Sequence, residues 1–218
     1  MTEEYRSKLI SRISRLNYTN HIYVKRTALL VLLCVFALFF GYLSHFLFIG
    51  DKEGMELIFK AHFCGYFKGM STPDSIRAVI SFASPDFFVV SAIMLLGYTM
   101  LSGIAGKLLL FLYSARLGWC LTFLFDFLIN DPKINGGASA FLLFAVCKLI
   151  IIVSLIFSAL RSEDFSYRFG EIFSKNRHPY IGAQSIAHIK GMASTAGFTA
   201  LINTIYLIFQ SLSGFAPL

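Results

Sequence analysis

Five long apolar runs constrain the fold of this chain more than any other feature. They cover residues 28–49, 87–106, 108–129, 138–160 and 193–215. About 20 helical residues, each rising about 1.5 Å, cross a hydrocarbon core of about 30 Å. The runs are continuously apolar and do not alternate with a period of two, as the strands of a membrane barrel do. We therefore predict an all-α polytopic membrane protein with five transmembrane helices in a single integral membrane domain, 1–218.

The composition agrees with this class of protein. Apolar residues make up 56% of the chain and charged residues only 14%, whereas a soluble domain carries about 25% charged residues. The first run begins too late and is too long for the core of a signal peptide, and no small-residue cleavage motif follows it. We expect this run to remain in the protein as a membrane helix.

The distribution of Lys and Arg predicts which side of the membrane each connecting segment faces. With the N-terminus inside, the segments 1–27 and 161–192 and the turn at Lys107 hold twelve basic residues on the cytoplasmic side. The segments 50–86 and 130–137 then hold five basic residues on the external side. Because cytoplasmic flanks carry the excess of Lys and Arg, we expect the N-terminus inside and the C-terminus outside.

The net charge of +7 does not require a nucleic acid as partner. The basic residues flank the predicted helices, where they meet anionic lipid headgroups. We therefore expect membrane lipids as partners and no nucleic acid.

Two segments outside the runs have amphipathic patterns. In 6–16, apolar residues share one helical face among basic residues. This pattern is typical of a helix that lies on the inner leaflet, but it also fits a solvated helical lead-in to the first span, and both interpretations stay open. The external segment 50–86 predicts an interfacial helix, because its apolar side chains recur at intervals of three and four residues. We expect Pro85 to separate this segment from the second span.

The external segment also offers the best candidate surface for a partner protein. Aromatic and Met side chains are enriched at protein interfaces, although contact with lipid explains the same face. The candidate contact residues are Phe59, His62, Phe63, Tyr66 and Phe67.

The sequence lacks the patterns that indicate catalysis or metal binding. Its four cysteines have no CxxC spacing, so we predict neither a zinc site nor a disulfide framework. It contains no phosphate-binding loop and no motif of serine hydrolases, zinc proteases or dinucleotide-binding enzymes. We expect a protein that is not an enzyme and has no cofactor or metal.

Three ionisable residues, Arg116, Asp126 and Lys148, lie inside predicted spans. Each costs roughly 2.5–3.5 kcal/mol at a helix centre. Arg116 is close enough to the cytoplasmic end to extend its head group to the interface, and a functional role is equally open. Asp126 and Lys148 lean toward each other across the hairpin of the third and fourth spans, which predicts a buried ion pair. A proton or ion pathway is the alternative.

Small residues spaced by four predict close helix packing in two spans. Ser102 and Gly106 have this spacing in the second span, and Ala193 and Gly197 have it in the fifth. Such pairs let membrane helices approach closely.

The chain resembles the stage II sporulation protein M family, five-span membrane proteins of endospore-forming bacteria. The similarity runs nearly end to end, through "LLVLLCVFALFFGYLSH", "MELIFKAHFCGYF", "IMLLGYTMLSGIAG", "ARLGWCLTFLF" and "FSYRF". The chain has Gly106–Lys107 where the family often has a proline. It has Ser84–Pro85–Asp86 where the family often has an Asn-containing approach to the second span.

The resemblance implies a non-enzymatic scaffold in the cell membrane, at the sporulation septum. It implies that the partners are extracytoplasmic peptidoglycan hydrolases, the stage II sporulation proteins D and P, which are held there during engulfment. The intramembrane charges motivate a second hypothesis, a membrane subunit of a small transporter or ABC-type permease. A permease would need a water-lined cavity reached by Asp126 and Lys148 and usually has internal repeats, and we find no convincing repeat in the sequence.

Overall fold

The computed structural model describes residues 3–47, 72–130, 137–174 and 181–212. These residues form five helices and the turn at 97–101, and they contain no strand. The helices are α1 (Glu3–Leu47), α3 (Thr72–Leu96), α4 (Ser102–Asn130), α5 (Gly137–Ser174) and α6 (Ile181–Leu212). The predicted all-α class is therefore confirmed.

Four of the helices contain segments long and apolar enough to cross a membrane: Ile22–Leu47, Ser102–Phe125, Phe141–Glu171 and Gly182–Phe209. Within the residues whose side chains the structure describes, α3 contributes an apolar helical segment, Ala83–Leu96. Large apolar side chains cover the outside of the bundle, as at Leu32, which is 68% exposed, and Ile104, which is 77% exposed. A soluble protein rarely leaves such surfaces uncovered. The helices therefore indicate a multi-pass membrane protein.

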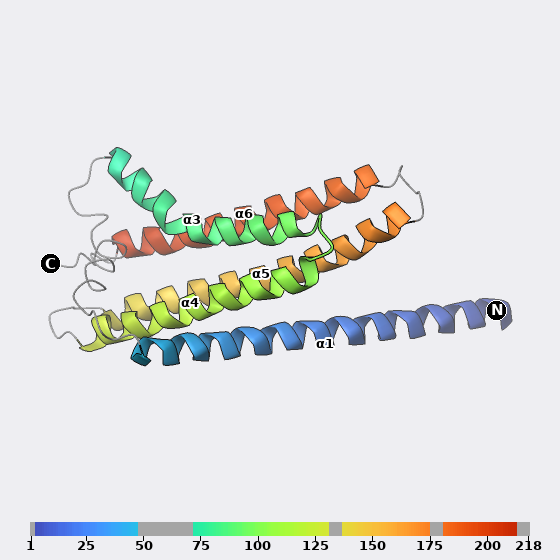
Figure 1. The fold of residues 1–218 in the computed structure, drawn as a ribbon, viewed down its shortest axis with the longest axis horizontal. Coiled ribbons are helices and arrows are strands. Elements are labelled where there is room, and N and C mark those ends of the chain that lie inside the picture. The colour runs from blue at the N-terminus through green and yellow to red at the C-terminus, as the bar shows by residue number, and fades with distance from the viewer. Residues whose placement is uncertain (1–2, 48–71, 131–136, 175–180, 213–218) are drawn as a thin grey trace.

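The helices alternate in direction along an elongated bundle (Figure 1). α1, α4 and α6 run one way, and α3 and α5 run the other, so that α1 begins at one end of the bundle and α6 finishes at the opposite end. α5 is the central helix, because it packs against α1, α3, α4 and α6. α1 lies at one side of the bundle and packs mainly on α4.

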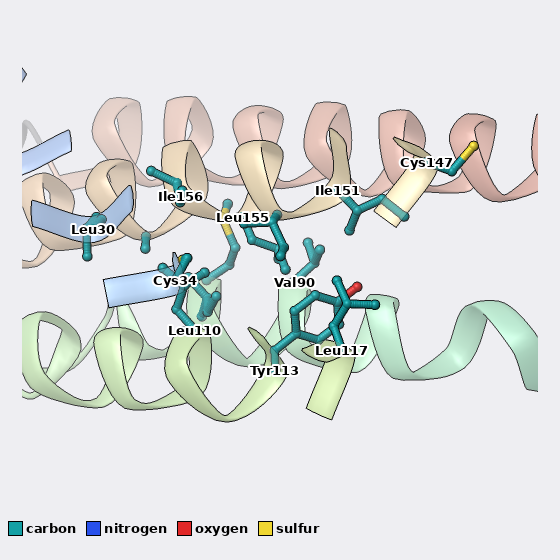
Figure 2. Packing of buried hydrophobic residues seen from close by; sticks show 14 of the residues in the cluster. Leu30, Cys34, Val90, Leu110, Tyr113, Leu117, Cys147, Ile151, Leu155 and Ile156 are labelled. Atoms are coloured by element: carbon teal, nitrogen blue, oxygen red, sulfur yellow. The ribbon is translucent and has the colours of Figure 1, made fainter. Parts of the chain in front are cut away.

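The core is a continuous apolar cluster with α5 at its centre. Ile151 and Leu155 of α5 are fully buried, as are Leu110 of α4 and Ile93 of α3. Figure 2 shows side chains from α1, α3, α4 and α5 converging in this cluster. Packing between the helices thus fixes their relative positions along the bundle.

Two glycines bring the backbones of α1 and α4 into direct contact. A Cβ atom added at Gly41 would collide with the backbone carbonyl of Ala115, and one added at Gly118 would collide with that of Leu38. Since only glycine leaves this space, the two helices cross at a very short distance, as small residues allow in membranes.

The break between the second and third predicted spans lies earlier in the chain than expected. α3 ends at Leu96, residues 97–101 form turns, and Gly106 lies inside α4. Short hydrogen bonds from the amides of Gly97 and Thr99 to carbonyls three residues earlier, at 3.0 and 2.8 Å, close the end of α3. Hydropathy does not detect this break, because the turn itself contains apolar residues, Met100 and Leu101. Both side chains are exposed.

Other helix ends also differ from the predicted segment bounds. Pro85 lies inside α3, which bends visibly in Figure 1, and proline is a common cause of such a kink. The segment 6–16 belongs to α1, which continues without interruption into the first apolar run. Most of the predicted loop 161–192 is helical, because α5 extends to Ser174 and α6 begins at Ile181.

Candidate functional site: a buried polar network

A buried carboxylate connects four helices of the bundle. Asp86 of α3 is 3% exposed, and its oxygens accept three hydrogen bonds. Tyr113 of α4 donates to Oδ1 at 2.7 Å. The Nζ atom of Lys148 on α5 donates to Oδ2 at 2.7 Å, and Nδ2 of Asn203 on α6 donates to the same oxygen at 2.8 Å.

The partners of Asp86 also bind one another. Nζ of Lys148 donates to Oδ1 of Asn203 at 3.1 Å, so the Asn203 amide bridges the acid and the base. Nζ also lies 5.8 Å from the centroid of the Phe144 ring, within reach of a cation–π interaction. Tyr113 and Lys148 are each 7% exposed and Asn203 is 2% exposed. We call Asp86, Tyr113, Lys148 and Asn203 the polar network.

The hydrogen bonds of the polar network offset the cost of burying two charges. A buried ion pair is stable only when its geometry is good and further hydrogen bonds satisfy the remaining polar atoms. Here the carboxylate has three donors and the ammonium has two acceptors. Such satisfied networks specify one arrangement of the surrounding elements. The network therefore holds α3 in register with α4, α5 and α6.

A second polar cluster surrounds the end of α3. Ser162 of α5 donates to the carbonyl of Ile93 at 2.6 Å and lies 3.0 Å from the hydroxyl of Ser102. The His188 ring of α6 donates through Nε2 to the carbonyl of Met94 at 3.0 Å. The same ring stacks on Phe165 with centroids 4.1 Å apart. Ser162 thus supplies a partner for the carbonyl of Ile93 at the helix end, and His188 adds a second donor to the carbonyl of Met94, which also accepts the amide of Gly97.

The structure places the predicted intramembrane charges in different surroundings. Arg116 is exposed on α4, and Lys148 belongs to the polar network. Asp126 is part of α4, but its side chain lies outside the described residues, and so does the predicted pair with Lys148. The predicted partner-contact residues 59–67 also lie outside the described part of the chain.

The residues predicted to allow helix packing are likewise dispersed. Ser102 is buried against Ser162. A Cβ at Gly106 or Gly197 would meet no described atom within 4 Å, and Ala193 is exposed. Among the described glycines, Gly41 and Gly118 are the ones at which an added Cβ would meet the backbone of another helix.

Metal-binding groups and cysteines in the described segments form no cluster. No group of three or more His, Cys, Asp or Glu residues among them could hold a metal ion. Cys34, Cys120 and Cys147 are free thiols.

Sequence reasoning missed Asp86, Tyr113 and Asn203 as members of a site. Asp86 directly precedes the second apolar run and was assigned to its external approach. A signal was present, because Asn203 and Lys148 are polar residues inside apolar runs, and buried polar groups in membranes pair with one another.

Searches of protein-family models, curated proteins and solved structures return no match to this chain.

Proposed function

We propose that this protein is a non-enzymatic membrane scaffold that holds extracytoplasmic peptidoglycan hydrolases at the septal membrane during engulfment. The partners would be proteins of the class of stage II sporulation proteins D and P, as the resemblance of the sequence implies. The observation that carries the proposal is the closed polar network. It favours a scaffold over a transporter, because the charge of Lys148 is used to hold the helices together.

The geometry of Lys148 bears on the alternative of a permease. A transport role for an intramembrane charge requires contact with a substrate, an ion or water along a pathway. Nζ of Lys148 is engaged by Asp86 and Asn203 at 2.7 and 3.1 Å. Releasing it would break an ion pair that joins α3 to α5. This role for Lys148 supports a rigid holder of other proteins over a moving transporter.

The proposed topology has five spans with the N-terminus inside. It treats α3, which contains Pro85 and the apolar segment Ala83–Leu96, as the second span. Basic residues at one end of the bundle support this orientation: Arg26 pairs with Asp164 at 3.2 Å and Lys107 pairs with Glu163 at 3.4 Å. Such charges favour the cytoplasmic side. The opposite end then faces outward together with the segment 50–86.

We propose that the hydrolases dock on the external segment through Phe59, His62, Phe63, Tyr66 and Phe67. The test is co-purification from detergent extracts of the native host, with mass spectrometry of the retained proteins. Asn substitutions at Phe63 and Phe67 should abolish retention of hydrolases without lowering the membrane level of the scaffold. The matched control is Tyr167→Asn on α5, because Tyr167 is an aromatic residue that is 72% exposed at the other end of the bundle.

The outcomes separate the competing functions. Retained hydrolases that are lost only with Phe63 and Phe67 support the scaffold and its docking surface. If Tyr167→Asn alone abolishes the retention of hydrolases, the docking surface is at the cytoplasmic end. An ATPase subunit in place of hydrolases would support the permease and overturn the scaffold proposal.

A further inference from the structure

A pocket with a volume of about 410 Å³ lies between α1, α5 and α6, and His188 of the second polar cluster is part of its lining. Its size falls within the roughly 300–1,000 Å³ of small-molecule sites. The polar network does not contribute to its lining, and the proposed docking of hydrolases does not use it. Neither the polar network nor the docking of hydrolases therefore explains which ligand this pocket would bind.

The lining of the pocket contains two arginines. Arg161 and Arg168 stand two turns apart on one face of α5, and both line the pocket. The acidic residue of the lining is Asp164, whose Oδ1 lies 3.2 Å from Nη1 of Arg26. Because Arg26 compensates this carboxylate from outside the lining, the pocket as a whole favours an anion.

Arg161 is held in place by α6. Its Nη2 atom donates to the carbonyl of Ala187 at 2.9 Å. Its guanidinium occupies the space that Gly191 leaves by having no side chain, since a Cβ at Gly191 would collide with it. One of the five N–H donors of a guanidinium is used in the bond to Ala187. A positioned guanidinium with further donors matches the oxygens of a phosphate.

The same face of α5 changes from apolar to charged along the helix. Phe157 lies one turn before Arg161, lines the pocket and is 52% exposed. A phospholipid changes in the same order, from an apolar acyl chain to a charged phosphate. Basic pockets between membrane helices are known to bind anionic headgroups.

We propose that this pocket binds the phosphate-bearing headgroup of an anionic phospholipid, in the leaflet at the end where α1 begins. Arg161 and Arg168 bind the phosphate, and Phe157 contacts the first part of the acyl chains. The site holds one lipid in a defined place, unlike the general attraction of basic flanks to the membrane surface.

The test uses the purified, delipidated full chain in neutral detergent and native mass spectrometry. Phosphatidylglycerol and phosphatidylcholine with identical acyl chains are added in separate titrations. We expect one phosphatidylglycerol to be retained and phosphatidylcholine to be lost. Arg161→Gln with Arg168→Gln should weaken retention by about 10- to 30-fold, from the usual contribution of each basic residue near a membrane surface.

The matched control removes two charges from outside the pocket. Lys25→Gln with Lys190→Gln changes exposed residues of α1 and α6, and we expect less than about a threefold effect because neither residue lines the pocket. Gly191→Ala is a second test if the double arginine variant does not fold. It keeps both charges but displaces the Arg161 guanidinium, and it should also weaken retention.

Four results would overturn the proposal. Equal retention of both lipids would remove the headgroup specificity. Equal loss in the two double variants, or full retention by Gly191→Ala, would show that surface charge alone attracts the lipid. Displacement of phosphatidylglycerol by millimolar inorganic phosphate would make the pocket a site for free phosphate.

Discussion

The Nζ atom of Lys148 lies 2.7 Å from Oδ2 of Asp86, although 62 positions separate the two residues in the chain. The pair joins α3 to α5, two helices that run in the same direction and are separated in sequence by α4. Tyr113 and Asn203 complete the hydrogen bonds of Asp86 from α4 and α6. A single carboxylate therefore stabilises the mutual packing of four helices.

The first prediction concerns the loss of this carboxylate. Asp86→Ala leaves the Lys148 ammonium buried without its counter-charge, and breaking a buried pair in this way costs about 3–5 kcal/mol. We expect a clear fall in the yield of monodisperse protein and in its Tm, measured by fluorescence-detected gel filtration after heating. The control is Asp164→Ala, whose partner Arg26 is 50% exposed, and it should cost at most about 1 kcal/mol. Equal effects of the two substitutions would contradict a structural role for the network.

The second prediction identifies the partner of Lys148 by double-mutant cycles. Lys148→Ala combined with Asp86→Ala should be less destabilising than the sum of the two single changes, with a coupling of about 0.5–3 kcal/mol for groups in contact. A parallel cycle with Asp126→Ala tests the hairpin pair that the sequence predicts. A larger coupling of Lys148 to Asp126 than to Asp86 would assign the dominant ion pair to the hairpin of α4 and α5.

The third prediction concerns the contact between α1 and α4. Gly118→Ala places a methyl group against the backbone carbonyl of Leu38, which cannot move without shifting α1. Overpacking of this kind costs about 1–3 kcal/mol, so we expect a lower Tm. Gly106→Ala in the same helix is the control, because its new Cβ meets no described atom within 4 Å, and alanine favours the helix. A Tm for Gly118→Ala as high as that of the control would show that the helices do not pack so closely.

The positions of the helices could largely be predicted from hydropathy, and their ends could not. Apolar runs mark where a helix is stable in lipid, and four of the five runs lie largely within the helices that can cross a membrane. The turn at 97–101 contains Met100 and Leu101, which are as apolar as the residues of the neighbouring spans. Its geometry depends on tertiary contacts, such as those of Ser162 and His188 with the end of α3, and no local pattern reports these contacts.

The polar network was only partly predictable for a related reason. A lysine inside an apolar run requires partners, so the importance of Lys148 follows from its surroundings in the sequence. The described partners of Lys148 are on α3 and α6. The partner that the sequence predicts, Asp126, is on α4, the helix that precedes α5 in the hairpin. To choose between Asp86 and Asp126 as the partner of Lys148, one must know which helices pack against α5 and which of their residues lie level with Lys148 along the bundle. That information arises from packing of the whole bundle.

The last prediction tests the orientation of the protein in the membrane. Cys64 should be the cysteine that an impermeant maleimide labels in intact cells, because the proposed topology places the segment 50–86 outside. Cys34 and Cys147 are buried within the bundle, and Cys120 lies on the spanning part of α4. Cys64→Ser should therefore abolish the labelling. Tyr167→Cys in that background supplies the opposite control, since residue 167 is strongly exposed at the proposed cytoplasmic end, and it should be labelled only after permeabilisation. Labelling of residue 167 in intact cells, with Cys64 protected, would reverse the topology and place the candidate docking segment in the cytoplasm.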